Sequence, residues 1–375
     1  MNSVKEVYGN RWMTWWRRNS TALPVAATIS CNLAYFVEAG YTRMAAVLSM
    51  ISLGGVTLYY ISKRRWKIKS RDLVILTGCN SGLGYSLAMH CRAQGATVLA
   101  GVRETAVMLK PNAAVESLKN KGIIIHQLDI TNAESVRGFG ERVKQLLEEQ
   151  QLVLRALVNN AGVMVFGEFE WQTQDLVENQ INVNLLGTMR ITRELMPIIR
   201  QNGSRIVVVS SHCAADPLPG ISIYAATKAA LHAWTTALRV EVGKYGVNVV
   251  DFIPGGFISE SNIMRRQRLF FDEMEQHMSD EAKQFYGNYF ARYAEYFSQA
   301  GLSSGNQDNI TVLSNPRIYE TFDSALLDVY PSAIYRCEPW RYFFYRILFK
   351  STPTWIRDRL VQNFVNAPSW QINKQ

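Results

Sequence analysis

Three polar residues in the middle of the chain have the types and the spacing to move a proton. Ser211 closes an apolar run, Tyr224 follows thirteen residues later, and Lys228 lies four residues further on. Four residues are close to one helical turn, so the tyrosine and lysine side chains share one helix face. A nearby ammonium favours the tyrosinate and lowers the tyrosine pKa, which suits proton transfer near neutral pH. A Y-x-x-x-K pair by itself is common on protein surfaces, and the spacing from Ser211 strengthens this one.

A glycine-rich turn lies upstream, at the end of an apolar run over 72–77. It reads Thr77-Gly78-Cys79-Asn80-Ser81-Gly82-Leu83-Gly84, and a helical pattern follows at once. Glycines let the backbone approach a pyrophosphate, and a helix N-terminus offers N–H groups and a positive dipole. The G-x-x-x-G-x-G spacing is a weak signal alone, but its position between a strand and a helix predicts a dinucleotide site.

Arg103 follows the next apolar run, 97–102, where the adenosine ribose of a bound dinucleotide usually lies. An acidic residue there accepts a hydrogen bond from the 2′-hydroxyl, whereas an arginine pairs with a 2′-phosphate. Arg103 therefore favours NADP(H) as the cofactor and leaves NAD(H) open. The alternative is a solvated surface arginine.

These candidate residues need a scaffold of alternating strands and helices. Six short runs rich in Val, Ile and Leu read as buried strands, at 72–77, 97–102, 123–127, 154–159, 205–210 and 247–252. Longer segments with a 3.6-residue period separate them. The alternation predicts an α/β fold with a doubly wound parallel sheet and helices on both faces, which binds its ligand beyond the C-terminal ends of the strands.

The N-terminal segment differs from the rest in charge. The chain has 375 residues and a net charge of +9, and residues 1–71 hold eleven Lys or Arg and two Glu, so the remainder is neutral. A nucleic-acid-binding domain usually carries its charge on its body, so this distribution argues against nucleic acid as a partner and favours a membrane-flanking segment. Residues 44–62 contain no charge and predict a transmembrane helix, and residues 21–37 form a shorter candidate.

Basic residues before the first apolar stretch and after the second favour a hairpin with both ends cytosolic. A helix buried against the body and a mitochondrial presequence are the alternatives. The predicted organisation is an N-terminal membrane anchor of one or two helices (1–71), a catalytic domain (72–335) and a C-terminal aromatic and basic extension (336–375). The five cysteines include no C-x-x-C pair, so no disulfide framework and no metal site are expected.

Together these motifs resemble the short-chain dehydrogenase/reductase family, with its Rossmann-type fold, over about 72–335. The resemblance implies that the cofactor contacts Thr77, Gly78, Asn80, Ser81, Gly82, Leu83, Gly84, Arg103, Asp129, Asn160, Ala161, Gly162, Tyr224, Lys228, Pro254, Gly255 and Ser259. It also implies four catalytic residues. Tyr224 would exchange the proton, Lys228 would lower its pKa and hold the nicotinamide ribose, Ser211 would bind the reacting oxygen, and Asn184 would hold a water linking Lys228 to solvent.

Within the family, the turn and its neighbours look like the retinol and 17β-hydroxysteroid dehydrogenase branch, which includes hydroxybutyrate dehydrogenase. The resemblance implies hydride transfer with a lipophilic alcohol or ketone, a steroid, sterol or retinoid, at the endoplasmic reticulum membrane with a cytosolic catalytic domain. A mitochondrial membrane is the alternative location. Family members often pair through the helices around Asn184 and Tyr224, so a homodimer is one expected state.

Three departures from that branch matter. Asn80 stands where the branch usually has Asp, and Arg103 where it often has an aliphatic residue, and both reinforce NADP(H). Residues 212–215 depart at the substrate site, which leaves the substrate open. Histidine and cysteine beside Ser211 also raise nucleophilic catalysis, but no triad partner or metal supports it. An NAD-dependent alcohol dehydrogenase and a catalytically silent lipid- or partner-binding protein are the competing functions.

Two aromatic segments are candidates for the substrate side. Residues 257–302 are expected to form a substrate lid containing Phe270, Phe271, Met274, Met278, Phe285 and Tyr286. Such a wall suits a large apolar ligand, although the same residues also fit the core of an amphipathic helix. The segment 340–348, with Trp355 beyond it, mixes aromatics with arginine and fits either a membrane surface or packing on the body.

Overall fold

The computed structural model describes residues 42–62, 64–103, 113–255, 262–302 and 312–370. The chain forms two compact units, described separately below. One contains residues 67–326 and 332–375, and the other contains the segment that ends at Trp66 together with Leu327–Pro331.

The large unit is built on a sheet of seven parallel strands in the order β3-β2-β1-β4-β5-β6-β7. The strands are β1 (Asp72–Thr77), β2 (Thr97–Val102), β3 (Ile124–Gln127), β4 (Val153–Asn159), β5 (Arg205–Val209), β6 (Asn248–Ile253) and β7 (Ile334–Arg336). All six residues of β1 are buried, which explains its continuous apolar run. The predicted α/β fold is confirmed, and the short edge strand β7 is an addition to the six expected strands.

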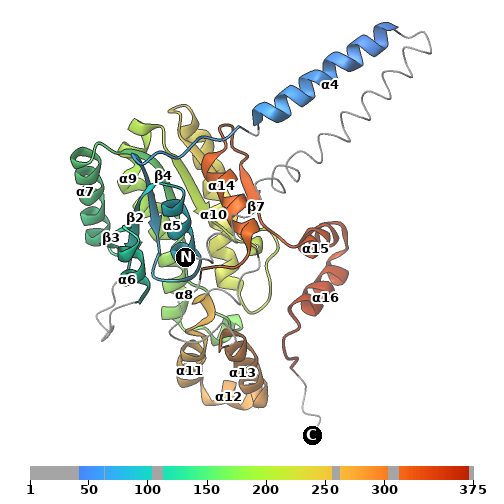
Figure 1. Cartoon of the computed structure of the whole chain (residues 1–375). Coiled ribbons are helices and arrows are strands. Elements are labelled where there is room, and N and C mark those ends of the chain that lie inside the picture. Colours follow the sequence, from blue (N-terminus) through green and yellow to red (C-terminus); the bar gives the residue numbers. More distant parts are fainter. Residues whose placement is uncertain (1–41, 63, 104–112, 256–261, 303–311, 371–375) are drawn as a thin grey trace. The chain divides into compact units, whose positions relative to one another are not determined.

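Helices lie on both sides of this sheet (Figure 1). The helices between β1 and β6 are α5 (Gly82–Ala93), α6 (Ala113–Asn120), α7 (Ala133–Glu149), α8 (Gln174–Ile181), α9 (Thr188–Asn202) and α10 (Ser222–Gly243). α7, α9 and α10 share one buried apolar cluster with the strands. Local signals set helix ends: the Asn132 side chain caps α7 by accepting from two backbone N–H groups, and Gly203 closes α9 with φ 57°.

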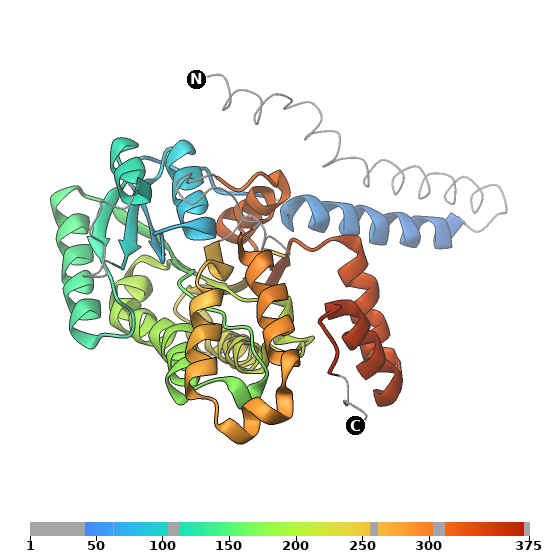
Figure 2. The ribbon, with the colours of Figure 1, turned by 90° about the horizontal axis from the view of Figure 1, so that it is seen from below.

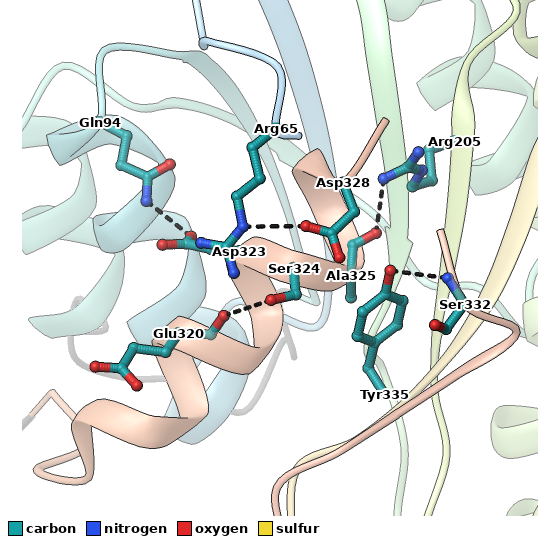
Figure 3. A network of polar contacts seen from close by, with 10 residues as sticks. All are labelled: Arg65, Gln94, Arg205, Glu320, Asp323, Ser324, Ala325, Asp328, Ser332 and Tyr335. Carbon is teal, nitrogen blue, oxygen red and sulfur yellow. Dashed lines mark hydrogen bonds and ion pairs between the residues drawn. The ribbon is translucent and has the colours of Figure 1, made fainter. Parts of the chain in front are cut away.

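The opposite face is covered in part by α14 (Pro316–Leu327), which comes from the C-terminal third of the chain. The Phe322 ring packs on Phe252 of β6, with 5.6 Å between ring centroids. His90 Nε2 of α5 and Nε2 of Gln94, the C-cap residue of that helix, lie 2.8 and 2.7 Å from Asp323 Oδ1. Figure 3 shows the Gln94–Asp323 contact beside a second one, in which the buried guanidinium of Arg205 donates to Ala325 O. Directional contacts therefore hold α14 to both α5 and β5.

Two further groups of helices complete the large unit. α11 (Gln267–His277), α12 (Asp280–Tyr286) and α13 (Asn288–Leu302) follow β6, and α11 and α13 lie side by side (Figure 2). α15 (Trp340–Ser351) and α16 (Thr354–Val365) form a pair in which the Tyr345 and Phe364 rings are 4.8 Å apart. The predicted lid, 257–302, thus folds largely as helices, and its first residues, 257–261, lie outside the described residues.

The small unit contains α4 (Thr42–Ser62), which includes the predicted membrane span 44–62. That segment is helical, but none of the helices in the described part of the chain is both long and apolar enough to cross a membrane. The other candidate, 21–37, lies outside the described residues. After α4 the chain pairs with residues 327–329, where Arg65 Nε lies 3.0 Å from Asp328 Oδ1 and Trp66 N donates to Leu327 O at 2.8 Å.

Candidate active site

The glycine-rich turn joins β1 to α5 and is tied to the end of β4 by side-chain hydrogen bonds. Thr77 Oγ1 accepts from the backbone N–H groups of Asn160 and Ala161, both at 3.0 Å. The Asn160 side chain returns the contact by donating to Thr77 O at 2.9 Å and Gly78 O at 3.1 Å. The C-terminal ends of two adjacent parallel strands are therefore fixed at one edge of the sheet, where such folds bind ligands.

The turn has no room for side chains at two glycines. A Cβ on Gly78, whose φ is 71°, would lie 2.7 Å from Ala161 Cα. A Cβ on Gly84 would overlap the Gly78 carbonyl oxygen and the Asn160 amide. Ser81 stands at the N-cap of α5 but makes no side-chain cap hydrogen bond, which leaves first-turn N–H groups for another acceptor. This bare backbone at a helix N-terminus fits the pyrophosphate of a dinucleotide.

Asn80 and Arg103 form a reciprocal pair at the end of β2. Asn80 Nδ2 donates to Arg103 O at 2.9 Å, and Arg103 N donates to Asn80 Oδ1 at 2.8 Å. An aspartate could accept the second bond but could not donate the first. The amide at position 80 thus fixes the backbone from which the Arg103 side chain extends, a mechanical role that the sequence argument about charge did not foresee.

The other predicted cofactor residues lie along the same edge of the sheet. Asp129 accepts hydrogen bonds from the backbone N–H and hydroxyl of Thr131 at 2.8 and 2.6 Å. Pro254 and Gly255 directly follow β6, and a Cβ on Gly255 would overlap the Cys337 carbonyl after β7. Ser259 lies outside the described residues.

Tyr224 and Lys228 lie on the buried face of α10, and Ser211 follows β5. Lys228 Nζ donates to Val209 O, the last residue of β5, at 2.9 Å and lies 5.7 Å from the centroid of the Tyr224 ring. Ser211 Oγ accepts from Cys213 N at 3.2 Å. The structure therefore places Tyr224 and Lys228 together on one face of α10, as their four-residue spacing predicted, and a hydrogen bond links Ser211 to Tyr224.

Burial dominates the ionisation of this group. It raises the pKa of Tyr224, and the charge of Cys213 adds to that rise while a hydrogen bond from Ser211 opposes it. Burial lowers the pKa of Lys228 to about 8, against the opposing attraction of Asp251. The expected lowering of the tyrosine pKa by the lysine is thus reversed, because desolvation of the phenolate outweighs its neighbours. The protonated phenol is the favoured form.

Asn184 lies in a π-helical segment, η2 (Asn182–Gly187), between α8 and α9. Its Nδ2 donates to Val163 O at 2.9 Å and Thr227 Oγ1 at 3.1 Å, and its Oδ1 accepts from Val163 N at 2.8 Å. A Cβ on Gly162 would lie 3.3 Å from Asn184 Oδ1 and 3.7 Å from Lys228 Nζ. Gly162 therefore leaves open space beside both polar groups, and the asparagine side chain joins Val163 to α10.

The candidate lid residues are mostly core residues. Phe270, Phe271 and Met274 are buried in an aromatic cluster that also contains Tyr224. Trp171 lies at its centre, in edge contacts with Tyr286, Tyr289, Phe290 and Tyr293. Phe285 is exposed. The alternative that these residues form the core of amphipathic helices thus accounts for much of this segment. The same aromatic cluster includes Tyr224.

The contact of α15 with the Ser211 segment was left open by the sequence. The Tyr342 ring lies edge-on to His212, with 5.0 Å between the ring centroids. Both rings line a small pocket, together with Asp216, Leu218, Glu338, Tyr345, Arg346, Phe349 and Phe364. Burial lowers the pKa of His212 to about 4 and raises that of Cys213 to about 11. A neutral thiol is a poor nucleophile, which argues against the cysteine chemistry raised above.

Helical spacing was the signal for this contact. One face of α15 carries Tyr342, Tyr345 and Phe349 toward the pocket. The other face exposes Trp340, Phe343, Phe344, Ile347 and Leu348, at the i, i+3, i+4, i+7 and i+8 positions of a helical stripe. The segment thus packs on the body with one face and presents an apolar stripe with the other.

Comparison with known proteins agrees with this architecture. The family model for short chain dehydrogenase matches residues 72–269. The mitochondrial D-beta-hydroxybutyrate dehydrogenase of Rattus norvegicus is 31% identical over 255 residues, covering 65% of this chain and 72% of that protein. Estradiol 17-beta-dehydrogenase 2 of Mus musculus is 31% identical over 280 residues, covering 72% of this chain and 71% of that one.

Among solved structures, a short-chain dehydrogenase from Streptomyces avermitilis superposes with a TM-score of 0.52 at 22% identity, covering 79% of this chain and 98% of that one. This likeness shows the shared fold. The family match and the curated relatives go further, because they extend over more than half of the chain. The chain belongs to the short-chain dehydrogenase family of NAD(P)-dependent oxidoreductases and resembles its hydroxysteroid, retinol and hydroxybutyrate dehydrogenase branch.

Proposed function

We propose that this protein transfers a hydride between NADP(H) and a lipophilic alcohol or ketone of the steroid, sterol or retinoid class. The observation that carries the proposal is the convergence of Ser211, Tyr224 and Lys228 at the C-terminal edge of the sheet, beside a bare glycine turn. When bound, the nicotinamide ring supplies or accepts the hydride. The chain's own residues orient the substrate and handle the proton.

In the reductive direction, Tyr224 donates its phenolic proton to the carbonyl oxygen as that oxygen gains negative charge. Its raised pKa favours the form that donates. Ser211 Oγ accepts from Cys213 N and also hydrogen-bonds with Tyr224, so its O–H group is placed to donate to a substrate oxygen that lies beside the phenol. Lys228 places a positive charge behind the tyrosine ring, which stabilises the phenolate left after transfer.

The preference for NADP(H) rests on Arg103 and Asn80. The reciprocal pair fixes the Arg103 backbone at the end of β2, where a 2′-phosphate would lie. A guanidinium forms charge-assisted hydrogen bonds with phosphate, and Asn80 adds no repelling charge. NAD(H)-dependent oxidation of such an alcohol is the second candidate, and cofactor titration separates the two.

The lipophilic substrate class is supported by two observations. The aromatic cluster of α11 and α13 contains Tyr224 itself, so a substrate reaching the proton donor meets apolar surface. Estradiol 17-beta-dehydrogenase 2 is named for a steroid and is 31% identical. The hydroxybutyrate dehydrogenase at the same identity is named for a small acid, so substrate screening should include both classes.

The proposal includes attachment to a membrane. Met44, Val47 and Met50 of α4 are exposed in a segment followed by Lys and Arg residues, and α15 exposes its own apolar stripe. Residues 336–360 carry six Lys or Arg and two acidic residues, a balance suited to anionic lipid. An endoplasmic reticulum or mitochondrial membrane and a homodimer stay predictions.

Membrane attachment is tested by sedimentation of the full chain with phosphatidylcholine vesicles, with and without phosphatidylserine. Serine at Phe343 and Phe344 should weaken binding to the anionic vesicles, whereas serine at the equally exposed Phe285 should not. If the wild type, the protein with serine at Phe343 and Phe344, and the protein with serine at Phe285 all bind the vesicles equally, α15 does not contact the membrane.

The catalytic proposal is tested by Tyr224→Phe in the detergent-purified full chain. Turnover of a responsive ketone or alcohol should fall about 10²- to 10⁴-fold, the usual contribution of a positioned acid. NADPH affinity, measured by fluorescence titration, should change less than about 3-fold because the phenol is not needed for the adenosine contacts. Near-normal turnover by the variant would overturn the mechanism, and a wild-type protein that binds NADPH but turns over no substrate would favour the silent alternative.

A further inference from the structure

A buried carboxylate that the proposed mechanism does not use lies on β6, against the helix α10 that carries Lys228. Asp251 interrupts the apolar strand β6, and its side chain is 1% exposed. His232 Nδ1 lies 2.6 Å from Asp251 Oδ2, a distance at which the ring N–H donates to the carboxylate. Burying a carboxylate in a sheet costs desolvation free energy unless a partner compensates for it, so a functional reason for an aspartate at this position is expected.

The fold directs this pair toward the lysine. His232 follows Lys228 by four residues on α10, so both side chains lie on one helix face. Adjacent residues of β6 point to opposite sides of the sheet, with Phe252 facing α14 and Asp251 facing α10. Val209, whose carbonyl accepts from Lys228, is paired with Phe252, the next residue after Asp251.

The groups around Lys228 come from each element packed against it. Tyr224 lies on its own helix, Cys213 on the segment after β5, Asn184 on η2 and Asp251 on β6. Burial keeps Tyr224 and Cys213 protonated near neutral pH, and Asn184 carries no charge. Within the described residues, Asp251 is therefore the anionic group of this set.

We propose that Asp251 and His232 are a positioning pair that keeps Lys228 charged at neutral pH, with His232 as the end of the pair that reaches solvent. This inference rests on the proposed function, because it assigns the pair a purpose through the role of Lys228. It adds two residues to the site that lie outside the Ser211, Tyr224, Lys228 and Asn184 set.

His232 and Asp251 have different electrostatic effects: His232 acts on Asp251, and Asp251 acts on Lys228. Burial raises the pKa of Asp251, and the hydrogen bond and charge of His232 oppose that rise, as does Lys228. His232 thus helps Asp251 stay ionised, and ionised Asp251 raises the pKa of Lys228 against its own desolvation. Since the balance leaves the pKa of Lys228 at about 8, a modest loss of attraction would discharge the lysine at cellular pH.

The first test compares pH–rate profiles of Asp251→Asn and His232→Gln with the wild-type full chain. Asp251→Asn should move the alkaline limb of kcat/KM to lower pH by about one unit, a 10-fold change in proton concentration, and His232→Gln should move it less in the same direction. Asp72→Asn is the matched control, because Asp72 is a buried carboxylate that pairs with Arg155 at the start of β1. It should lower stability and leave the limb in place.

The second test needs no turnover. The folded protein releases the Lys228 proton near pH 8 and the unfolded chain near its ordinary value, so the unfolded state binds more protons between them and stability rises with pH there. In Asp251→Asn this rise should begin about one pH unit lower, as measured by urea unfolding at a series of pH values, whereas Asp72→Asn should show the wild-type onset.

The two tests separate the two claims. A shifted onset of the stability rise without measurable turnover would support the pair while counting against the proposed function. An unshifted alkaline limb and an unshifted onset in a folded Asp251→Asn protein would overturn the pair. If Asp251→Asn does not fold, His232→Gln carries both measurements, and an unchanged result for it has the same meaning.

Discussion

The cofactor side and the substrate side of the site differ in the balance between hydrogen bonds and aromatic packing. On the cofactor side, side chains such as Thr77, Asn80 and Asn160 hydrogen-bond directly to backbone groups, and the glycines allow no added atom. On the substrate side, aromatic edge contacts such as those around Trp171 and Tyr342 add to a few hydrogen bonds, among them the reciprocal pair between the Gln267 side chain and the Phe166 backbone.

Hydrogen bonds are directional and weaken when one atom moves. Apolar packing, in contrast, tolerates replacement of one apolar side chain by another of similar volume. The difference suits a site in which the nucleotide shape is constant while the substrate varies. It also predicts that equal-sized changes have unequal consequences on the two sides.

The largest effect is expected from one methyl group on the cofactor side. Gly84→Ala places a Cβ onto the Gly78 carbonyl and the Asn160 amide, so the turn must shift. We expect a loss of about 1–3 kcal/mol of stability, as for other overpacked sites, and at least a 10-fold weaker NADPH affinity by titration. Gly138→Ala is the control, because its Cβ meets nothing within 4 Å on α7 and should be neutral or slightly stabilising. Normal NADPH binding by Gly84→Ala would show that this turn can shift without loss of the cofactor site.

An intermediate effect is expected from the arginine at the end of β2. Arg103→Ala removes charge-assisted hydrogen bonds, which contribute about 1.5–3 kcal/mol, so NADPH affinity should fall about 10-fold or more while NADH affinity changes little. Arg268→Ala, an arginine of α11 on the substrate side, should alter neither affinity. Equal losses for both cofactors would show that Arg103 does not discriminate between them.

The smallest effect is expected on the substrate side and depends on pH. The pKa of His212 is about 4 in the folded protein and near its ordinary value when unfolded, so the unfolded chain takes up the proton first as pH falls below about 6.5. Stability should therefore decline between pH 6.5 and 4 by at most about 1.4 kcal/mol per unit from this residue.

His212→Phe keeps an aromatic contact with Tyr342 and removes the titration, so its unfolding midpoint should depend less on pH in that range. His126→Phe, at a half-buried histidine of β3, serves as the control for the exchange of an imidazole for a phenyl ring. A variant at position 212 that tracks the wild type would place His212 in water rather than beneath α15.

The sequence alone predicted the sheet closely. Strands β1 and β2 begin and end at the predicted residues, because strands buried on both faces are continuous apolar runs bounded by polar or glycine residues. The spacing of Tyr224 and Lys228 also predicted their proximity, because four residues along a helix fix which side chains share a face. β7 escaped prediction because a strand of three residues, none of them buried, carries little periodicity.

Tertiary structure decided what composition and spacing do not encode. Whether Tyr224 is a neutral phenol or a phenolate depends on how far the fold excludes solvent from it. That burial comes from α11, α13 and the segment after β5 together. The meeting of His232 with Asp251 joins a helix to a strand nineteen residues away, and the contact of Tyr342 with His212 joins segments farther apart still. Local periodicity determines secondary structure, whereas desolvation and long-range pairing arise only when the elements pack.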